Sequence, residues 1–183
     1  MAKKEVSFPK RVAVLSLTGN VGKSTLVNTL LYPRMPGAKI FRVETINATA
    51  ASGSEEIRVR GDQLDRLKVG MTKAETSIVD VGSSNVESFI LGLNEDWGSH
   101  QFFDLFLVPV LALDQEKETE DAIKTILALH DMGVESSRIK TVFNKLPLRS
   151  SIEEECSTFL QFHKENPLFA CTPRPLCQTS CRL

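Results

Sequence analysis

A glycine-rich turn between an apolar run and a helix-forming stretch is the feature that most constrains the fold of this chain. Residues 11–17 form the apolar run, and residues 18–25 then read Thr-Gly-Asn-Val-Gly-Lys-Ser-Thr. In a strand–loop–helix unit of this kind, the backbone N–H groups of the loop and the helix N-terminus face an anion. Lys23 can reach the outer phosphates of a nucleotide, and the Ser24 hydroxyl can hold a magnesium ion.

The predicted phosphate-binding loop departs from the standard pattern, which has a glycine at the position of Leu17. Asn20 tolerates a left-handed backbone better than most residues, so it can take the place of a glycine. A chance glycine-rich turn is the alternative interpretation. The order of strand, loop, Lys-Ser-Thr and helix favours the phosphate-binding loop, whose predicted ligand-binding residues are Gly19, Asn20, Val21, Gly22, Lys23, Ser24 and Thr25.

Strand patterns alternate with helix patterns along the rest of the chain. We expect strands at residues 11–17, 39–44, 76–82, 103–110 and 138–144. We expect helices at residues 61–70, after residue 84, before Gly133 and from residue 151 to about 164, with a mobile loop at residues 47–60. This alternation predicts an α/β fold with a doubly wound, mainly parallel sheet. Residues 1–174 are expected to form one domain, followed by a flexible tail at residues 175–183.

Local patterns predict where two of these helices begin and which side of a third is buried. Ser84 with Glu87, and Ser151 with Glu154, match the spacing of the capping box. The helix before Gly133 is expected to turn one apolar stripe towards the sheet, made of Ile123, Ile126, Leu127 and His130.

Composition excludes several other classes of protein. Hydrophobic residues make up 42% and charged residues 25% of the sequence, and the net charge is −1, so no general attraction to nucleic acid is expected. No apolar run is long enough to span a membrane. The first residues lack the apolar core of a signal peptide, which predicts a cytoplasmic protein. The cysteines at positions 156, 171, 177 and 181 match no common zinc-site spacing, so free thiols are expected.

Asp80 is the second candidate for nucleotide chemistry. It follows Ile78 and Val79 near the end of an apolar strand and precedes Gly82. A carboxylate at the carboxyl end of a central strand lies where α/β sheets bind ligands. There it would order magnesium and its water shell, as a Walker B aspartate does. The alternative is an ordinary aspartate in a strand-to-helix turn.

The loop at residues 18–25 resembles the deviant Walker A loop of the ParA/MinD family of P-loop ATPases, which is Lys-Gly-Gly-x-Gly-Lys-Ser/Thr-Thr. The resemblance covers residues 11–174. Within the family, the chain is most similar to StbB-like plasmid stability proteins, which share Gly-Asn-Val-Gly-Lys-Ser in the loop, Val-Glu-Thr-Ile-Asn in the second strand and Asp-Val-Gly in the third.

This resemblance implies a SIMIBI-like P-loop architecture, a bound ATP or ADP, and Mg²⁺ held by Ser24 and Asp80. It also implies a role in plasmid stability, DNA partition or conjugative transfer. The partners that it implies are a plasmid-encoded DNA-binding protein, nonspecific DNA and, in a nucleotide-dependent homodimer, a second copy of the chain.

Two positions depart from the family in a way that affects hydrolysis. Thr18 stands where the family has the lysine that reaches the partner's nucleotide, and Ile46 stands where it has the carboxylate that orients water. In the family, the second strand ends in Asp-x-Asp, and Glu44 stands at the first of these two carboxylates. The candidate catalytic residues are therefore Lys23, Asp80 and Glu44. The sequence therefore predicts a weak ATPase that acts as a slow nucleotide-dependent switch.

Two later residues bear on the choice of base. Asn144 closes the predicted fifth strand, where an Asn of the family hydrogen-bonds adenine. GTPases read guanine with an Asp three residues further on, and that position is Pro147 here, so adenine is favoured. Pro173 is expected to line the other side of the base, as a similar loop does in the family.

Two other functions stay open at this point. A metabolic P-loop enzyme, such as a kinase or a ligase similar to dethiobiotin synthetase, would need a pocket for its acceptor, and residues 47–60 offer no clear set of polar groups for one. A nucleotide-binding module with little hydrolysis is the other alternative. It is favoured over a fast ATPase by Thr18 and Ile46.

Overall fold

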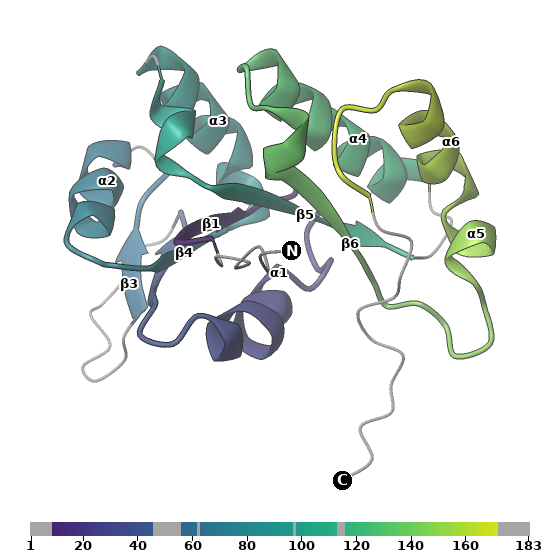
Figure 1. Ribbon diagram of the computed structural model, residues 1–183, viewed down its shortest axis with the longest axis horizontal. Helices are drawn as coiled ribbons and strands as arrows, with labels where there is room; N and C mark the ends of the chain where they lie inside the picture. Colours follow the sequence, from purple (N-terminus) through teal and green to yellow (C-terminus); the bar gives the residue numbers. More distant parts are fainter. Residues whose placement is uncertain (1–8, 46–55, 62, 97, 113–115, 172–183) are drawn as a thin grey trace, which may run out of the picture.

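The centre of the molecule is a parallel β-sheet with helices on both faces (Figure 1). The computed structural model describes residues 9–45, 56–61, 63–96, 98–112 and 116–171. Within these residues the sheet has six strands in the order β3-β2-β4-β1-β5-β6, and every neighbouring pair is parallel. The strands are β1 (Arg11–Val14), β2 (Lys39–Val43), β3 (Glu56–Val59), β4 (Ser77–Val81), β5 (Leu105–Leu111) and β6 (Ile139–Asn144). The predicted doubly wound α/β fold is confirmed.

The two faces of the sheet carry unequal sets of helices (Figure 1). One face is covered by α2 (Leu64–Thr72), α3 (Val86–Glu95), α4 (Glu116–Asp131) and α6 (Ser157–Glu165). The other face is covered by α1 (Lys23–Leu26), which continues without a break into η1 (Val27–Leu31) and η2 (Tyr32–Arg34). The remaining helical segments are short: η3 (Ser83–Asn85), η4 (Ser99–Phe102), η5 (Ser136–Arg138) and α5 (Ile152–Glu155).

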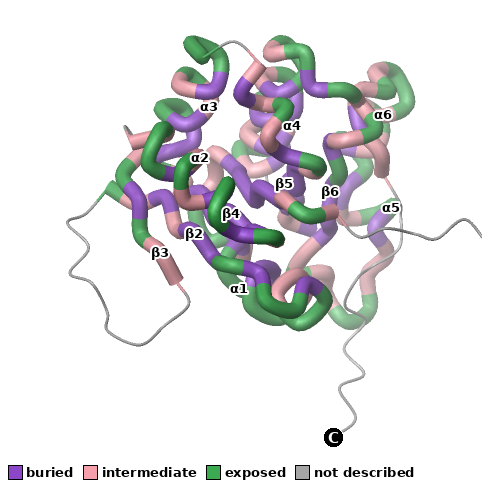
Figure 2. The backbone as a smooth tube through the Cα atoms, turned by 60° about the vertical axis from the view of Figure 1, so that its left-hand side comes forward, coloured by how far each residue is buried: buried purple, intermediate pink, exposed green. Residues whose placement is uncertain are grey.

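Alternating side chains of the central strands divide the apolar interior into two cores, one on each face. On β1, Val12 and Val14 face α1, whereas Ala13 and Leu15 face the larger set of helices. Figure 2 shows the central strands as mostly buried, whereas the edge strand β3 is largely intermediate or exposed. The larger core holds most of the buried aromatic rings, and Phe103 packs against Phe89 and Phe106 at 5.9 and 5.2 Å between ring centroids.

The connections make the carboxyl end of β1 a ligand-binding position. From β1 the chain runs through α1 on one face to β2, and from β4 it runs through α3 on the other face to β5. The two connections therefore leave the sheet in opposite directions around β1. Open α/β sheets bind their ligands at the carboxyl edge, at such a change of direction.

Three of the local predictions are wrong. The expected loop at residues 47–60 contains β3 in its last part, where alternate residues Ile57 and Val59 pack against the larger core. Residues 47–55 of that loop lie outside the described residues. The helix expected at residues 61–70 is present with Leu67 buried, although it begins at Leu64 and continues to Thr72.

Another wrong prediction is the capping box at Ser84 and Glu87. Here η3 precedes α3, and the Ser84 hydroxyl lies 3.0 Å from that of Thr45 instead of capping the helix. The box at Ser151 and Glu154 is confirmed, with both of its hydrogen bonds present at the start of α5.

The buried face of α4 also differs from the expected stripe. Ile126 is buried and Ile123 half-buried, but Leu127 and His130 are exposed. The residues that face the sheet are Thr119, Ala122, Thr125, Ile126 and Leu129. The buried face differs from the prediction because several of its residues are alanine or threonine. A search for large apolar side chains at helical spacing does not detect these residues. Gly133 ends the segment in a left-handed conformation, as expected.

Candidate phosphate-binding site

The predicted loop lies at the carboxyl end of β1 and leads into α1. Asn20 and Gly22 have positive φ angles of 58° and 88°, so Asn20 does take the left-handed conformation that its residue type tolerates. The first turn of α1 closes with a 2.9 Å hydrogen bond from the Leu26 N–H to the Gly22 carbonyl. A Cβ added at Gly22 would lie 2.3 Å from Asn144 Nδ2, so the backbone of the loop passes closely under the end of β6.

Lys23 is buried within the loop, with 8% of its surface exposed. Its ammonium group donates hydrogen bonds to the carbonyls of Ser16 at 3.2 Å and Thr18 at 2.9 Å. Burial lowers the pKa of Lys23 from its usual value, and the nearby Asp80 carboxylate partly opposes that shift. A buried, poorly hydrated cation at the start of a helix is well suited to bind an anion.

Ser24 and Asp80 come from different elements and meet beside Lys23. The Ser24 hydroxyl, on the first turn of α1, donates a 2.7 Å hydrogen bond to Asp80 Oδ2 at the end of β4. Asp80 is 5% exposed. A hydroxyl and a carboxylate are hard oxygen ligands of the kind that Mg²⁺ prefers. The structure thus brings together the two residues predicted to hold the metal, and their donor chemistry fits it.

Arg42 is a member of this cluster that sequence reasoning missed. Its Nη1 donates a 2.5 Å hydrogen bond to Asp80 Oδ2, and its Nε and Nη2 donate to both carboxylate oxygens of Glu56 at 3.0 and 2.9 Å. The Glu56 hydrogen bonds raise the pKa of Arg42, and Arg42 in turn lowers the pKa of Glu56. The sequence did contain a sign of this role, because Arg42 is a charged residue inside β2, two positions after the buried Ile40.

The end of β6 holds the loop from the opposite side. Asn144 Nδ2 donates to the Val21 carbonyl at 2.9 Å, and Lys145 Nζ donates to the Asn20 carbonyl at 2.6 Å. Sequence reasoning gave no role to Lys145, which has a φ angle of 60°. Asn144 therefore contacts the loop in this structure, and its contact with adenine stays a prediction.

Thr18 is tied to α4 instead of projecting from the molecule. Its hydroxyl donates a 2.8 Å hydrogen bond to Asp121, and the neighbouring Leu17 N–H donates to the Thr125 hydroxyl at 3.3 Å. The Thr125 hydroxyl donates in turn to the Asp121 carbonyl at 2.7 Å. These bonds fix the start of the loop against a helix that the sequence analysis had connected only with the core.

The other candidate residues lie nearby or outside the described residues. Glu44 is half-buried directly after β2, and its charge is the smallest of the causes that raise the pKa of Arg42. Gly19 and Thr25 are exposed within the loop segment. Ile46, Asn47 and Pro173 lie outside the described residues.

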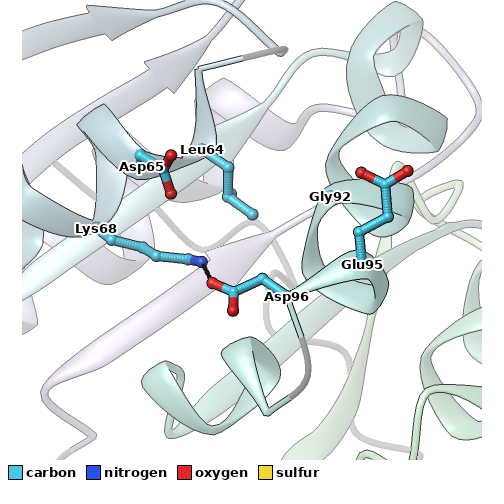
Figure 3. Close-up of a pocket in the computed structure, with 6 residues that line it drawn as sticks. All are labelled: Leu64, Asp65, Lys68, Gly92, Glu95 and Asp96. Atoms are coloured by element: carbon cyan, nitrogen blue, oxygen red, sulfur yellow. Dashed lines mark hydrogen bonds and ion pairs between the residues drawn. The ribbon is translucent and has the colours of Figure 1, made fainter.

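A separate groove lies between α2 and α3 (Figure 3). It is lined by Leu64, Asp65, Lys68, Gly92, Glu95 and Asp96. Lys68 and Asp96 form an ion pair across it, so its remaining charges are the carboxylates of Asp65 and Glu95. These side chains belong to the face of the sheet opposite α1, and their excess negative charge does not suit a phosphate.

No other candidate centre emerges from the part of the chain that the structure describes. Those residues include no group of three or more His, Cys, Asp or Glu side chains arranged to hold a metal ion. Of the four cysteines, the structure describes Cys156 and Cys171, and neither of these two forms a disulfide bond. None of the helices described is both long enough and apolar enough to cross a membrane.

No protein-family model matches the chain, and no curated protein matches it.

Proposed function

We propose that this chain is an ATP-binding P-loop protein similar to the ParA/MinD family, and that it acts as a slow nucleotide-dependent switch. The observation that supports this most strongly is the contact between Ser24 and Asp80, 2.7 Å apart at the carboxyl edge of the sheet and next to the buried Lys23. Two residues at the start of α1 and one near the end of β4 therefore lie together, which supports a site for phosphates and a magnesium ion.

Each residue of the cluster has a separate task in this proposal. The N–H groups of residues 19–25 and Lys23 bind the phosphates, while Ser24 and Asp80 hold Mg²⁺ directly and through its waters. When bound, the metal would neutralise charge that develops on the transferring phosphoryl group. Glu44, which directly follows β2, is the carboxylate that we propose to orient water.

Slow hydrolysis is proposed because two groups of an efficient site are replaced. Ile46 has no oxygen with which to orient water, and Thr18 has no positive charge to offset that of the phosphoryl group. The Thr18 hydroxyl donates to Asp121 within the same chain, which supports a role for Thr18 in fixing the loop. Binding is therefore expected to persist while the chemical step is slow.

The wider role that we propose follows from the resemblance to StbB-like proteins. It is plasmid stability, partition or conjugative transfer in the cytoplasm, with a DNA-binding protein, DNA or a second copy of the chain as partner. Adenine is the proposed base, with Asn144 and Pro173 beside it, because Pro147 cannot supply the carboxylate that reads guanine.

Isothermal titration calorimetry with ATP and Mg²⁺ tests the binding site. Lys23→Ala is expected to weaken ATP binding at least about tenfold, the effect of one lost charge-assisted hydrogen bond. Lys39→Ala is the matched control, since Lys39 is exposed at the amino end of β2, and its affinity should equal that of the wild type. Unchanged affinity in Lys23→Ala would overturn the assignment of the loop.

Two further measurements test the switch and the base. Steady-state turnover of the purified protein should stay below about 1 s⁻¹ without a partner, because that rate already lies within the ordinary enzyme range. GTP should compete with ATP poorly. Faster turnover would contradict the slow switch, and equal or tighter GTP binding would contradict the choice of adenine.

A further inference from the structure

Arg42 places a buried positive charge on the carboxylate that the proposed function assigns to magnesium. Arg42 and Asp80 are paired in register on the adjacent strands β2 and β4, and both side chains point to the α1 face. Their side chains are 11% and 5% exposed. The Asp80 oxygen that Arg42 contacts, Oδ2, is the same one that accepts the Ser24 hydrogen bond. The best metal ligand of the cluster is thus already paired with a cation.

The guanidinium has a second and larger anchor. Two of its nitrogens donate to the two oxygens of Glu56 on β3, and Nη2 also lies 3.3 Å from Asn28 Oδ1. Only Nη1 is directed to Asp80. Loss of the Asp80 contact would therefore leave Arg42 with a bidentate carboxylate partner, so the guanidinium can release Asp80 without becoming an unpaired buried charge.

We infer that Arg42 competes with magnesium for Asp80 Oδ2, holding this oxygen in the metal-free protein and moving to Glu56 alone when the metal binds. The inference rests on the proposed function, because it concerns the same metal. A guanidinium keeps its proton, so Arg42 must move away from the metal instead of becoming neutral. Glu56 is then a positioning residue, since it sets how readily Arg42 leaves.

The test is the magnesium concentration at which ATP binding is half restored, measured by calorimetry at stepped Mg²⁺ concentrations. Arg42→Gln should lower this midpoint about tenfold, because the metal no longer displaces a charge-assisted hydrogen bond. Glu56→Gln should raise it, because Arg42 loses the partner that draws it away. Lys39→Gln removes one positive charge from the exposed amino end of β2, three residues before Arg42, and should leave the midpoint unchanged.

A double variant separates positioning by Glu56 from simple loss of a negative charge. If Glu56 acts through Arg42, the variant with both Arg42→Gln and Glu56→Gln should have the midpoint of Arg42→Gln alone. Thermal unfolding of every variant without ligand confirms that each is folded. The opposite shift in Glu56→Gln keeps the test decisive even where Arg42→Gln does not fold.

The outcomes distinguish the two proposals. If the wild type binds ATP but Arg42→Gln keeps the wild-type midpoint, or Glu56→Gln fails to raise it, the competition between Arg42 and magnesium is wrong and the nucleotide site stands. If the wild type binds no ATP at any magnesium concentration, the proposed function is wrong, and this inference falls with it.

Discussion

Replacing Gly22 with alanine is expected to lower the free energy of unfolding by about 2–3 kcal/mol, and the structure separates this loss into two parts. Gly22 has a φ angle of 88°, where an L-residue costs roughly 1–2 kcal/mol. The new Cβ would also lie 2.3 Å from Asn144 Nδ2, so the Asn144 side chain must move and lose its 2.9 Å hydrogen bond to the Val21 carbonyl. That bond contributes about 1 kcal/mol.

Gly98→Ala is a matched control for the backbone part of this loss. Gly98 has the same φ angle of 88°, but nothing lies within 4 Å of a Cβ added there. Urea denaturation should therefore give a loss of about 1–2 kcal/mol for Gly98→Ala, smaller than for Gly22→Ala by the value of the Asn144 hydrogen bond. Equal losses in the two variants would refute the close approach between the loop and β6.

Asn144→Ala completes a double-mutant cycle with Gly22→Ala. Because both single variants lose the same hydrogen bond to Val21, the double variant should be about as stable as Gly22→Ala alone. Strict additivity of the two losses would show that the Asn144 side chain keeps its bond in Gly22→Ala, and the reasoning would be wrong.

Three further predictions concern other parts of the molecule. Ser151→Ala should cost about 1 kcal/mol in urea denaturation, because it removes one of the two hydrogen bonds of the capping box with Glu154. Phe159→Ala should cost about 3–5 kcal/mol, because this ring is fully buried in the larger core; a loss below about 1 kcal/mol would contradict the packing of α6. The lowered pKa of Glu56 should stabilise the protein above pH 4.5, and this stabilisation should be lost as the pH falls through the folded-state pKa. Denaturation in steps from neutral pH to about pH 3 should therefore show a shallower loss in Glu56→Gln than in the wild type, and equal slopes would contradict the ion pair with Arg42.

The sequence predicted the strands whose side chains are buried on both faces. Continuous apolar runs identify β4 and β5, since central parallel strands have no solvent-facing side. β3 was missed because it is a short edge strand in which apolar residues alternate with Glu56 and Arg58, and its apolar side chains are identified only by the packing that covers them. Tertiary contacts likewise override the local signal at Ser84, whose hydroxyl meets Thr45.

Some residues of the candidate site can likewise be predicted from short sequence motifs, whereas others depend on contacts between distant parts of the chain. Lys23, Ser24 and Asp80 could be located from the sequence because each lies at a strand end or helix start that a short motif marks. Arg42 could not be located in this way, because its role depends on the strand register that pairs it with Asp80. The two strands β2 and β4 are adjacent in the sheet but not consecutive in the sequence. Lys145 could not be located in this way either, since its contact with Asn20 joins residues 125 positions apart.

The charges around the loop explain how a bound nucleotide could change the protein. In this structure Lys23 is held by two loop carbonyls, and Arg42 is held by two carboxylates. Phosphates would compete with the carbonyls for Lys23, and a magnesium ion would compete with Arg42 for Asp80. Each ligand therefore replaces a contact within the chain, and a ligand shifts a conformational equilibrium only through such differences between states. Because Glu56 lies on β3, at the edge of the described sheet, the proposed movement of Arg42 would link magnesium binding at Asp80 to that edge.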